Sequence, residues 1–103
     1  MDEILENKKM NFDSETYEGL TLLIFSAEWC GPCKIIMALV EDLKKETDNI
    51  YIVNVDENPL IVEKYSVKSV PTILFFKDKK LVETLVGYRN RNELMEKIQF
   101  LKQ

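Results

Sequence analysis

Two cysteines, Cys30 and Cys33, are the residues of this chain best suited to covalent chemistry. They stand in the run Trp29-Cys30-Gly31-Pro32-Cys33, and the 103-residue sequence has no other cysteine and no histidine. Two cysteines three residues apart at the start of a helix lie one turn from each other. One sulfur can then attack a disulfide and the other can attack the mixed disulfide that forms. The spacing therefore indicates thiol–disulfide exchange.

The position of the motif before a predicted helix separates the roles of the two sulfurs. Cys30 would lie beside unpaired N–H groups and the positive end of the helix dipole, which favour its thiolate. We therefore expect Cys30 to be the nucleophile and Cys33 to be the resolving cysteine. Pro32 suits the first turn of a helix, and Gly31 leaves room for a bulky substrate. Trp29 offers substrate an apolar contact or else covers the edge of a core.

Half of a zinc site is the main alternative for a Cys-x-x-Cys motif. A structural zinc ion takes four nitrogen or sulfur ligands, and this sequence has two cysteines and no histidine. Only a metal-bridged dimer could complete such a site. We expect no metal, and no cofactor beyond a redox-active disulfide between Cys30 and Cys33.

The residues on either side of the motif predict the elements that hold it. Residues 20–26 are almost continuously apolar, which predicts a strand buried on both faces. Residues 33–47 are apolar in the first half and charged in the second, and they predict one helix. A strand over 50–55 follows, and then a short helix with Asn58 as its cap and Pro59 as its first residue.

The last third of the chain predicts a hairpin and a closing helix. Residues 72–76 and 81–86 are strand-like runs on either side of a charged turn at 77–80. Asn90 and Glu93 have the spacing of a capping box, and apolar residues follow at helical spacing. These residues are Leu94, Met95, Ile98 and Leu101.

The order of these elements predicts an α/β fold, a three-layer sandwich with a central mixed sheet, in one domain over residues 1–103. Weaker signals predict a short strand over 3–6 and a short helix over 13–18. The cysteines fall at the carboxyl end of a central strand, where open α/β sheets place their sites.

Charge and hydropathy narrow the classes of partner. A formal net charge of −4 and a pI near 4.9 provide no basic face, so we expect neither nucleic acid nor a membrane surface as a partner. The first residues lack the apolar core of a signal peptide, and the longest apolar run is too short to span a bilayer. We expect a cytoplasmic monomer whose cysteines are thiols when idle.

Four blocks of the sequence, taken in order, resemble the thioredoxin family along nearly the whole chain. They are Ala-Glu-Trp-Cys-Gly-Pro-Cys-Lys at 27–34, Asn-Val-Asp-Glu-Asn-Pro at 54–59, Val-Lys-Ser-Val-Pro-Thr at 67–72 and Val-Gly at 86–87. The resemblance implies the thioredoxin fold and dithiol–disulfide exchange with protein substrates that contain disulfides. It also implies recharging by a thioredoxin reductase.

The resemblance further implies a substrate groove around the cysteines. Pro71 should be a cis proline that faces them, and the backbone of Val70 should pair with an extended substrate segment. Asp56 would accept a hydrogen bond from the indole of Trp29, or would serve only as a turn residue. The groove would be lined by Trp29, Gly31, Pro32, Val70, Pro71, Gly87 and Tyr88.

The chain departs from the pattern of the family in the strand that leads to the motif. A buried Asp six residues before the first cysteine is Ile24 here, and the usual lysine partner is Ile52. Replacing a buried ion pair by apolar packing is often neutral or stabilising by about 1–4 kcal/mol. Because that carboxylate is credited with taking the proton of the resolving cysteine, we expect slow resolution by Cys33, with water, the departing thiolate or Glu28 as acceptor.

Two further departures concern local structure. Ala38 stands where the family has a proline inside the helix, so a kink there has no local cause. Lys79 stands in the hairpin turn where a glycine is common, which would cost about 1 kcal/mol if its φ is positive.

Three functions are compatible with these residues. The first is a general or semi-dedicated protein disulfide reductase, which the intact Cys30, Cys33 and Pro71 favour. The second is a binding module, or a dedicated electron donor to one enzyme with slow general activity, which Ile24 and Ile52 suggest. The third is an oxidase or isomerase, which the Gly-Pro pair between the cysteines and the missing export signal disfavour.

Overall fold

Strand β1 (Leu20–Ser26) runs through the middle of a sheet in the computed structural model, which describes residues 18–103. The remaining elements are α1 (Gly31–Met37), α2 (Val40–Lys44), β2 (Asn49–Asn54), α3 (Pro59–Lys64), β3 (Thr72–Lys77), β4 (Lys80–Val86) and α4 (Arg91–Lys102). The strand predicted over 3–6 and the helix predicted over 13–18 lie outside the described residues, apart from Glu18.

The sheet is mixed, as the sequence predicts. Its strand order is β2-β1-β3-β4. Strand β1 is parallel to β2 and antiparallel to β3, and β3 and β4 form an antiparallel hairpin. All seven residues of β1 are buried, because helices cover both faces of the sheet at this strand.

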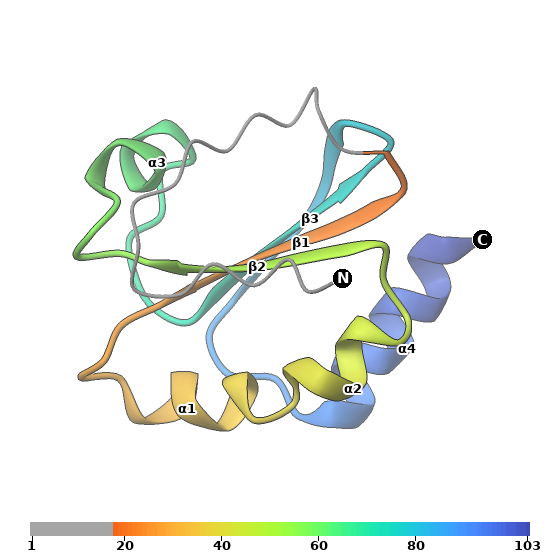
Figure 1. The fold of residues 1–103 in the computed structure, drawn as a ribbon, viewed down its shortest axis with the longest axis horizontal. Coiled ribbons are helices and arrows are strands. Elements are labelled where there is room, and N and C mark those ends of the chain that lie inside the picture. The colour runs from red at the N-terminus through yellow and green to blue at the C-terminus, as the bar shows by residue number, and fades with distance from the viewer. Residues whose placement is uncertain (1–17) are drawn as a thin grey trace.

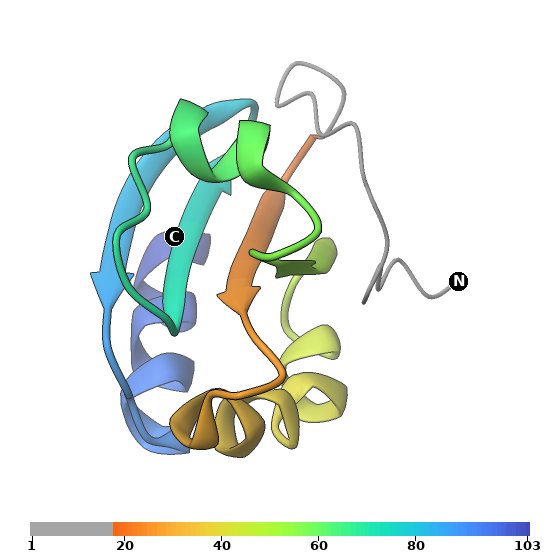
Figure 2. The ribbon, with the colours of Figure 1, turned by 90° about the vertical axis from the view of Figure 1, so that its left-hand side faces the viewer.

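Helices α1, α2 and α4 cover one face of the sheet and α3 covers the other, so the fold is the predicted three-layer sandwich (Figures 1 and 2). Two apolar cores lie between these layers. The α4-side core consists of Leu20, Leu22, Ile24, Ile36, Val40, Leu43, Ile50, Ile52, Ile73, Phe75, Leu94 and Ile98. The α3-side core consists of Leu23, Phe25, Tyr51, Val53, Ile61, Leu74 and Phe76.

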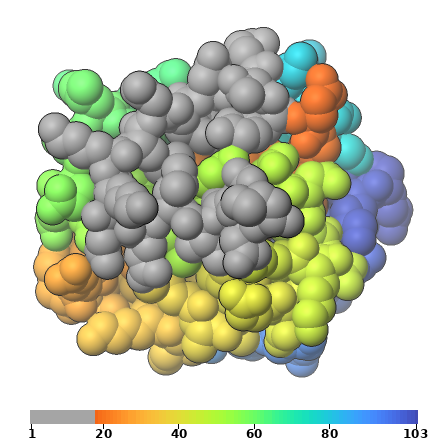
Figure 3. Space-filling view, viewed as in Figure 1, coloured from red at the N-terminus to blue at the C-terminus, as the bar shows by residue number. Residues whose placement is uncertain are grey.

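The single helix predicted over 33–47 is wrong, because the structure divides this segment into α1 and α2. Ala38 and Leu39 keep right-handed helical dihedral angles, but the Leu39 N–H donates to the Ile36 carbonyl at 2.9 Å, three residues back. This tighter turn bends the chain without a proline. Ile36 before the bend and Val40 after it then both pack in the α4-side core. The two helices form one continuous edge of the surface (Figure 3).

Helix α3 begins at Pro59 as predicted, but the predicted cap by the Asn58 side chain is wrong. Asn58 occupies the capping position without a hydrogen bond from its side chain to the helix N-terminus. Its amide donates instead to the Asn54 carbonyl at 2.9 Å. The side chain is thus used to close the turn after β2, a longer-range contact that the local sequence does not specify.

Helix α4 has the predicted capping box between Asn90 and Glu93. Its C-terminal end is held by contacts distant in sequence. The Lys77 ammonium donates to the carbonyls of Leu101 and Gln103, at the helix end where a positive charge is favourable. Hydrogen bonds from Lys102 and then Gln99 hold the pKa of the Glu46 carboxyl below its usual value.

The hairpin turn places Lys79 at φ +78°, which confirms that this position favours glycine. We expect Lys79→Gly to stabilise the protein by about 1 kcal/mol and to raise the melting temperature by about 4 °C. The ion pair lost, Lys79 with Glu18 at 3.2 Å, is exposed and contributes little. Thermal unfolding followed by circular dichroism measures the change.

Lys79→Ala is the matched control for this prediction. It removes the same ion pair but keeps a Cβ atom at a positive φ, so its melting temperature should not rise. A decrease with Lys79→Gly would contradict the predicted strain at this turn.

Candidate active site

Cys30 is the residue that caps helix α1. The chain leaves β1 through a turn in which the Cys30 N–H donates to the Ala27 carbonyl at 3.2 Å. Cys30 is extended, and its Sγ accepts a hydrogen bond from the Cys33 N–H at 3.2 Å. Pro32 lies in the first turn of the helix, where its missing N–H leaves no donor unpaired. The helix N-terminus thus directs an N–H group at one sulfur, as the sequence predicts.

The two cysteines form a disulfide, with 5.3 Å between their Cα atoms. Cys30 is 3% exposed and Cys33 is fully buried. The structure is therefore that of the oxidised form. Both residues are buried, and of the two only Cys30 keeps a small exposed surface toward a substrate.

Trp29 is 70% exposed beside the disulfide, and its side chain is held in place. The indole N–H donates to Asp56 Oδ2 at 3.1 Å, which confirms the predicted bond between these residues. Asn54 Oδ1 accepts from the N–H groups of Asp56 and Glu57 at 2.9 and 3.2 Å. Sequence reasoning missed this role of Asn54, although an Asn side chain in a turn often bonds to the backbone two residues later.

Val70 lies beside the two cysteines, and Pro71 follows it in the chain. The peptide bond between them is cis, as the resemblance implies. Val70 and Val55 pack against the cluster formed by the two cysteines and Ala27. The Pro71 carbonyl accepts a hydrogen bond at 2.9 Å from Gly87, whose φ is +91°. Contacts therefore link Val70 to the cysteines, and Pro71 to Gly87.

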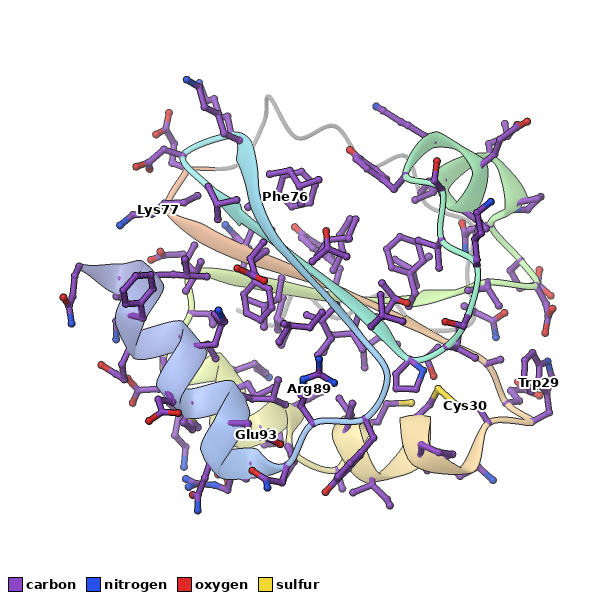
Figure 4. The ribbon with its side chains drawn as sticks, turned by 180° about the vertical axis from the view of Figure 1, so that it is seen from behind. Trp29, Cys30, Phe76, Lys77, Arg89 and Glu93 are labelled. Carbon is purple, nitrogen blue, oxygen red and sulfur yellow. A yellow bond between two sulfur atoms is a disulfide. The ribbon has the colours of Figure 1, made fainter. Side chains whose placement is uncertain are left out.

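Open surface surrounds the disulfide on several sides. A pocket of about 160 Å³ lies between Trp29 and the chain from Val67 to Val70, with mostly apolar lining. A Cβ atom at Gly31 would meet nothing within 4 Å, so this face of the motif is free. Tyr88, next to Gly87, is nearly half exposed. Figure 4 shows Trp29 and the disulfide together at one end of the sheet.

Comparison with known proteins places the chain in a family. The family model described as Thioredoxin matches residues 3–100. The chain belongs to the thioredoxin family. A thioredoxin of Bacillus subtilis is 44% identical over 96 residues, which cover 90% of this chain and 92% of that one. A thioredoxin of Chlamydia caviae is 42% identical over 90 residues, covering 85% and 88%.

A solved structure agrees with this assignment. A mutant thioredoxin from Halobacterium salinarum NRC-1 superposes with a TM-score of 0.81 at 34% identity, covering 88% of this chain and 82% of that chain. As a thioredoxin-family protein, the chain is a protein thiol–disulfide oxidoreductase, and thioredoxin reductase returns it to the dithiol form.

The centre of the sheet beneath the motif is apolar in this thioredoxin-family chain. Ile24 is fully buried and lies in register with Ile52 on β2 and Ile73 on β3, all three within the α4-side core. Ile24 and Ile52, at the two positions where the family usually has charged residues, thus pack against apolar neighbours. Glu28, the predicted substitute proton acceptor, is an exposed residue.

A cavity of about 370 Å³ opens beside α1 at the carboxyl ends of β1 and β2. It is lined by Ser26, Ala27, Glu28, Lys34, Met37, Ile52 and Asn54. Because Ile52 is the neighbour of Ile24 in the sheet, this cavity brings solvent close to the position of the missing carboxylate. Within residues 18–103, no group of three acidic or cysteine side chains could hold a metal ion. No helix in that range is long and apolar enough to cross a membrane.

Proposed function

We propose that the chain reduces disulfides in cytoplasmic proteins, with Cys30 as the attacking thiolate and Cys33 as the resolving thiol. The observation that carries the division of roles is the hydrogen bond from the Cys33 N–H to Cys30 Sγ, at the positive end of α1. It favours negative charge on Cys30, whereas the complete burial of Cys33 favours the neutral thiol.

The reaction then runs in two exchange steps. The Cys30 thiolate attacks one sulfur of a substrate disulfide, which forms a mixed disulfide and releases the first substrate thiolate. Cys33 loses its proton and attacks Cys30 Sγ, which forms the internal disulfide and releases the second substrate thiolate. The substrate gains two electrons and leaves as two thiolates, and the chain loses two electrons and the Cys33 proton. Water or the released thiolate accepts the Cys33 proton, because Ile24 cannot.

We assign the substrate groove to the residues around the disulfide. Support comes from the exposed indole of Trp29, the open face at Gly31 and the packing of Val70 on the cysteines. An extended substrate segment would pair with the backbone of Val70 as an added strand. The proposed groove residues are Trp29, Gly31, Pro32, Val70, Pro71 and Gly87.

The proposal treats the chain as a monomer of one domain, residues 1–103, that needs no cofactor, nucleic acid or membrane. Support comes from the family model, which matches nearly all of that range, and from the net charge of −4, which disfavours phosphate-rich surfaces. A reactive dithiol suits a reducing compartment, which keeps the two cysteines as thiols when idle.

Reduction of insulin by dithiothreitol tests the proposal. Catalytic amounts of the chain should accelerate the precipitation of insulin B chains, and the rate should increase in proportion to the concentration of the chain. A Cys30→Ala variant is the control and should give the rate of dithiothreitol alone. No acceleration by the native chain, together with stable complexes with partners, would contradict turnover and favour a binding module.

A further inference from the structure

Most cationic side chains in the described part of the chain have partners within it. Lysine and arginine residues on the helices and in the hairpin form ion pairs with Glu18, Glu41, Asp42, Glu46 and Glu83. Lys77 donates to carbonyls at the end of α4, and Lys64 lies over the ring of Tyr65. Like Lys77, four further cations within residues 18–103 have no carboxylate or ring partner, namely Lys34, Lys68, Lys80 and Arg89.

Three of these four cations lie in segments that neighbour proposed groove residues in the chain. Lys34 follows Cys33 on α1, and Lys68 lines the pocket beside Trp29. Arg89 follows Gly87 and Tyr88 in the chain, and Figure 4 shows it near the middle of the molecule, by the start of α4. Lys80 alone lies elsewhere, at the start of β4 and next to the hairpin turn.

Arg89 differs from the two lysines because its position is fixed. It is half-buried, and its Nη1 donates to the carbonyls of Val86 and Tyr88, both at 3.1 Å. Nε and Nη2 have no partner within residues 18–103. A guanidinium presents its N–H groups as a planar fork that matches a carboxylate. Little side-chain freedom is lost on binding, because two hydrogen bonds already hold the group.

The guanidinium lies beside Gly87, one of the proposed groove residues. A Cβ atom built on Gly87 would be 3.9 Å from Arg89 Nη1. The Gly87 N–H is bonded to Pro71, the proposed wall of that groove. On the other side of the disulfide the charges are acidic, since Glu28, Asp56 and Glu57 flank Trp29 and Asp56 is already bonded to the indole.

We propose that Arg89 is a specificity residue that binds a carboxylate of the substrate protein next to the disulfide being reduced. The inference rests on the proposed function and deepens it, because it names the substrate class as disulfides flanked by acidic residues. Lys34 and Lys68 add positive potential around the same groove. Charge complementarity of this kind selects partners more than it adds affinity.

Two disulfide-bonded peptides of the same sequence test the inference, one with Glu and the other with Gln beside the cysteines. Each kcat/KM is divided by the rate with dithiothreitol alone, which removes differences in intrinsic reactivity. We expect the native chain to prefer the Glu peptide about fivefold at low salt, and the preference to shrink as salt is added.

Substitutions of Arg89 then separate charge from loop structure. Arg89→Gln should reduce the ratio between the peptides to about one, and Arg89→Lys should keep part of it. The matched control is Lys80→Gln, which removes an equally unpaired cation far from the groove and should leave the ratio at its native value. Each variant is assayed with both peptides. A shift of the loop that affects both peptides equally leaves the ratio of their kcat/KM values unchanged.

Two outcomes would overturn the inference while leaving the proposed function intact. One is equal reduction of both peptides by the native chain, and the other is a preference that survives Arg89→Gln. Reduction of neither peptide above the dithiothreitol rate would instead contradict the proposed function, and this inference with it.

Discussion

Replacing Cys33 by serine is expected to trap partner proteins on Cys30 and to stop turnover. The Cys30 thiolate can still attack a substrate disulfide, but no thiol remains one helical turn away to release the product. An intramolecular thiol has a very large effective concentration, so insulin turnover should fall by about 100-fold or more. Partners should appear on non-reducing gels as bands that disappear when dithiothreitol is added.

Cys30→Ser is the paired control for this result. It leaves Cys33 as the remaining thiol, and Cys33 is fully buried. Neither turnover nor trapped partners should appear with this variant. Trapping by Cys30→Ser but not by Cys33→Ser would reverse the two roles and contradict the argument from the capping position of Cys30.

Ile24→Asp is expected to increase turnover near neutral pH by about tenfold and to lower the free energy of unfolding by about 3 kcal/mol. The rate should rise because a buried carboxylate, whose pKa burial raises, can take the Cys33 proton. Stability should fall because Ile24 is fully buried among Ile52 and Ile73, with no cation beside it. Insulin turnover from about pH 5 to 9 and urea unfolding from about pH 3 to 9 measure the two effects.

The stability loss should depend on pH in a defined direction. The introduced carboxyl would have a higher pKa in the folded state than its value of about 3.9 in the unfolded chain. The loss caused by its charge should therefore be small below about pH 4 and should increase as pH rises toward the folded-state pKa. A loss that is independent of pH would show that packing, and not charge, dominates at this position.

Ile24→Asn is the matched control for the rate. Asparagine has nearly the same size as aspartate and destabilises the core, but it cannot accept a proton near neutral pH. If both variants turn over equally fast, the proton-transfer argument is wrong. If Ile24→Asp alone is faster, the new carboxylate has taken the proton of Cys33. Solvent in the 370 Å³ cavity beside Ile52 can then remove that proton from the carboxyl group.

The residues of the motif and the ends of the strands could be predicted because their causes are local. The apolar run of β1, the capping box of Asn90 and Glu93 and the hairpin around Lys79 each depend on a few neighbouring residues. The family resemblance supplied what local reasoning could not, namely the cis bond before Pro71 and the bond from Trp29 to Asp56. Both depend on segments that only the folded chain brings together.

The features that the sequence did not reveal depend on contacts between distant elements. The helix breaks after Met37 although no proline is present, because both halves pack against one twisted sheet. Asn58 does not cap α3, and its side-chain amide donates to the Asn54 carbonyl across the turn after β2. The sequence does not distinguish Arg89 from the other cations, because its place beside Gly87 and its lack of an ion pair within residues 18–103 depend on the folded chain.

The two apolar cores on opposite faces of the sheet support different parts of the site. The helix that carries Cys33 is anchored through Ile36 in the α4-side core, whereas Val55 and Val70, beside the cysteines, pack against the α3-side core. Substitutions in the first core act on the sulfurs through the helix that carries Cys33. Substitutions in the second core act through Val55 and Val70, which also pack against the cysteines, so a change of partners on that side also changes the surroundings of the sulfurs.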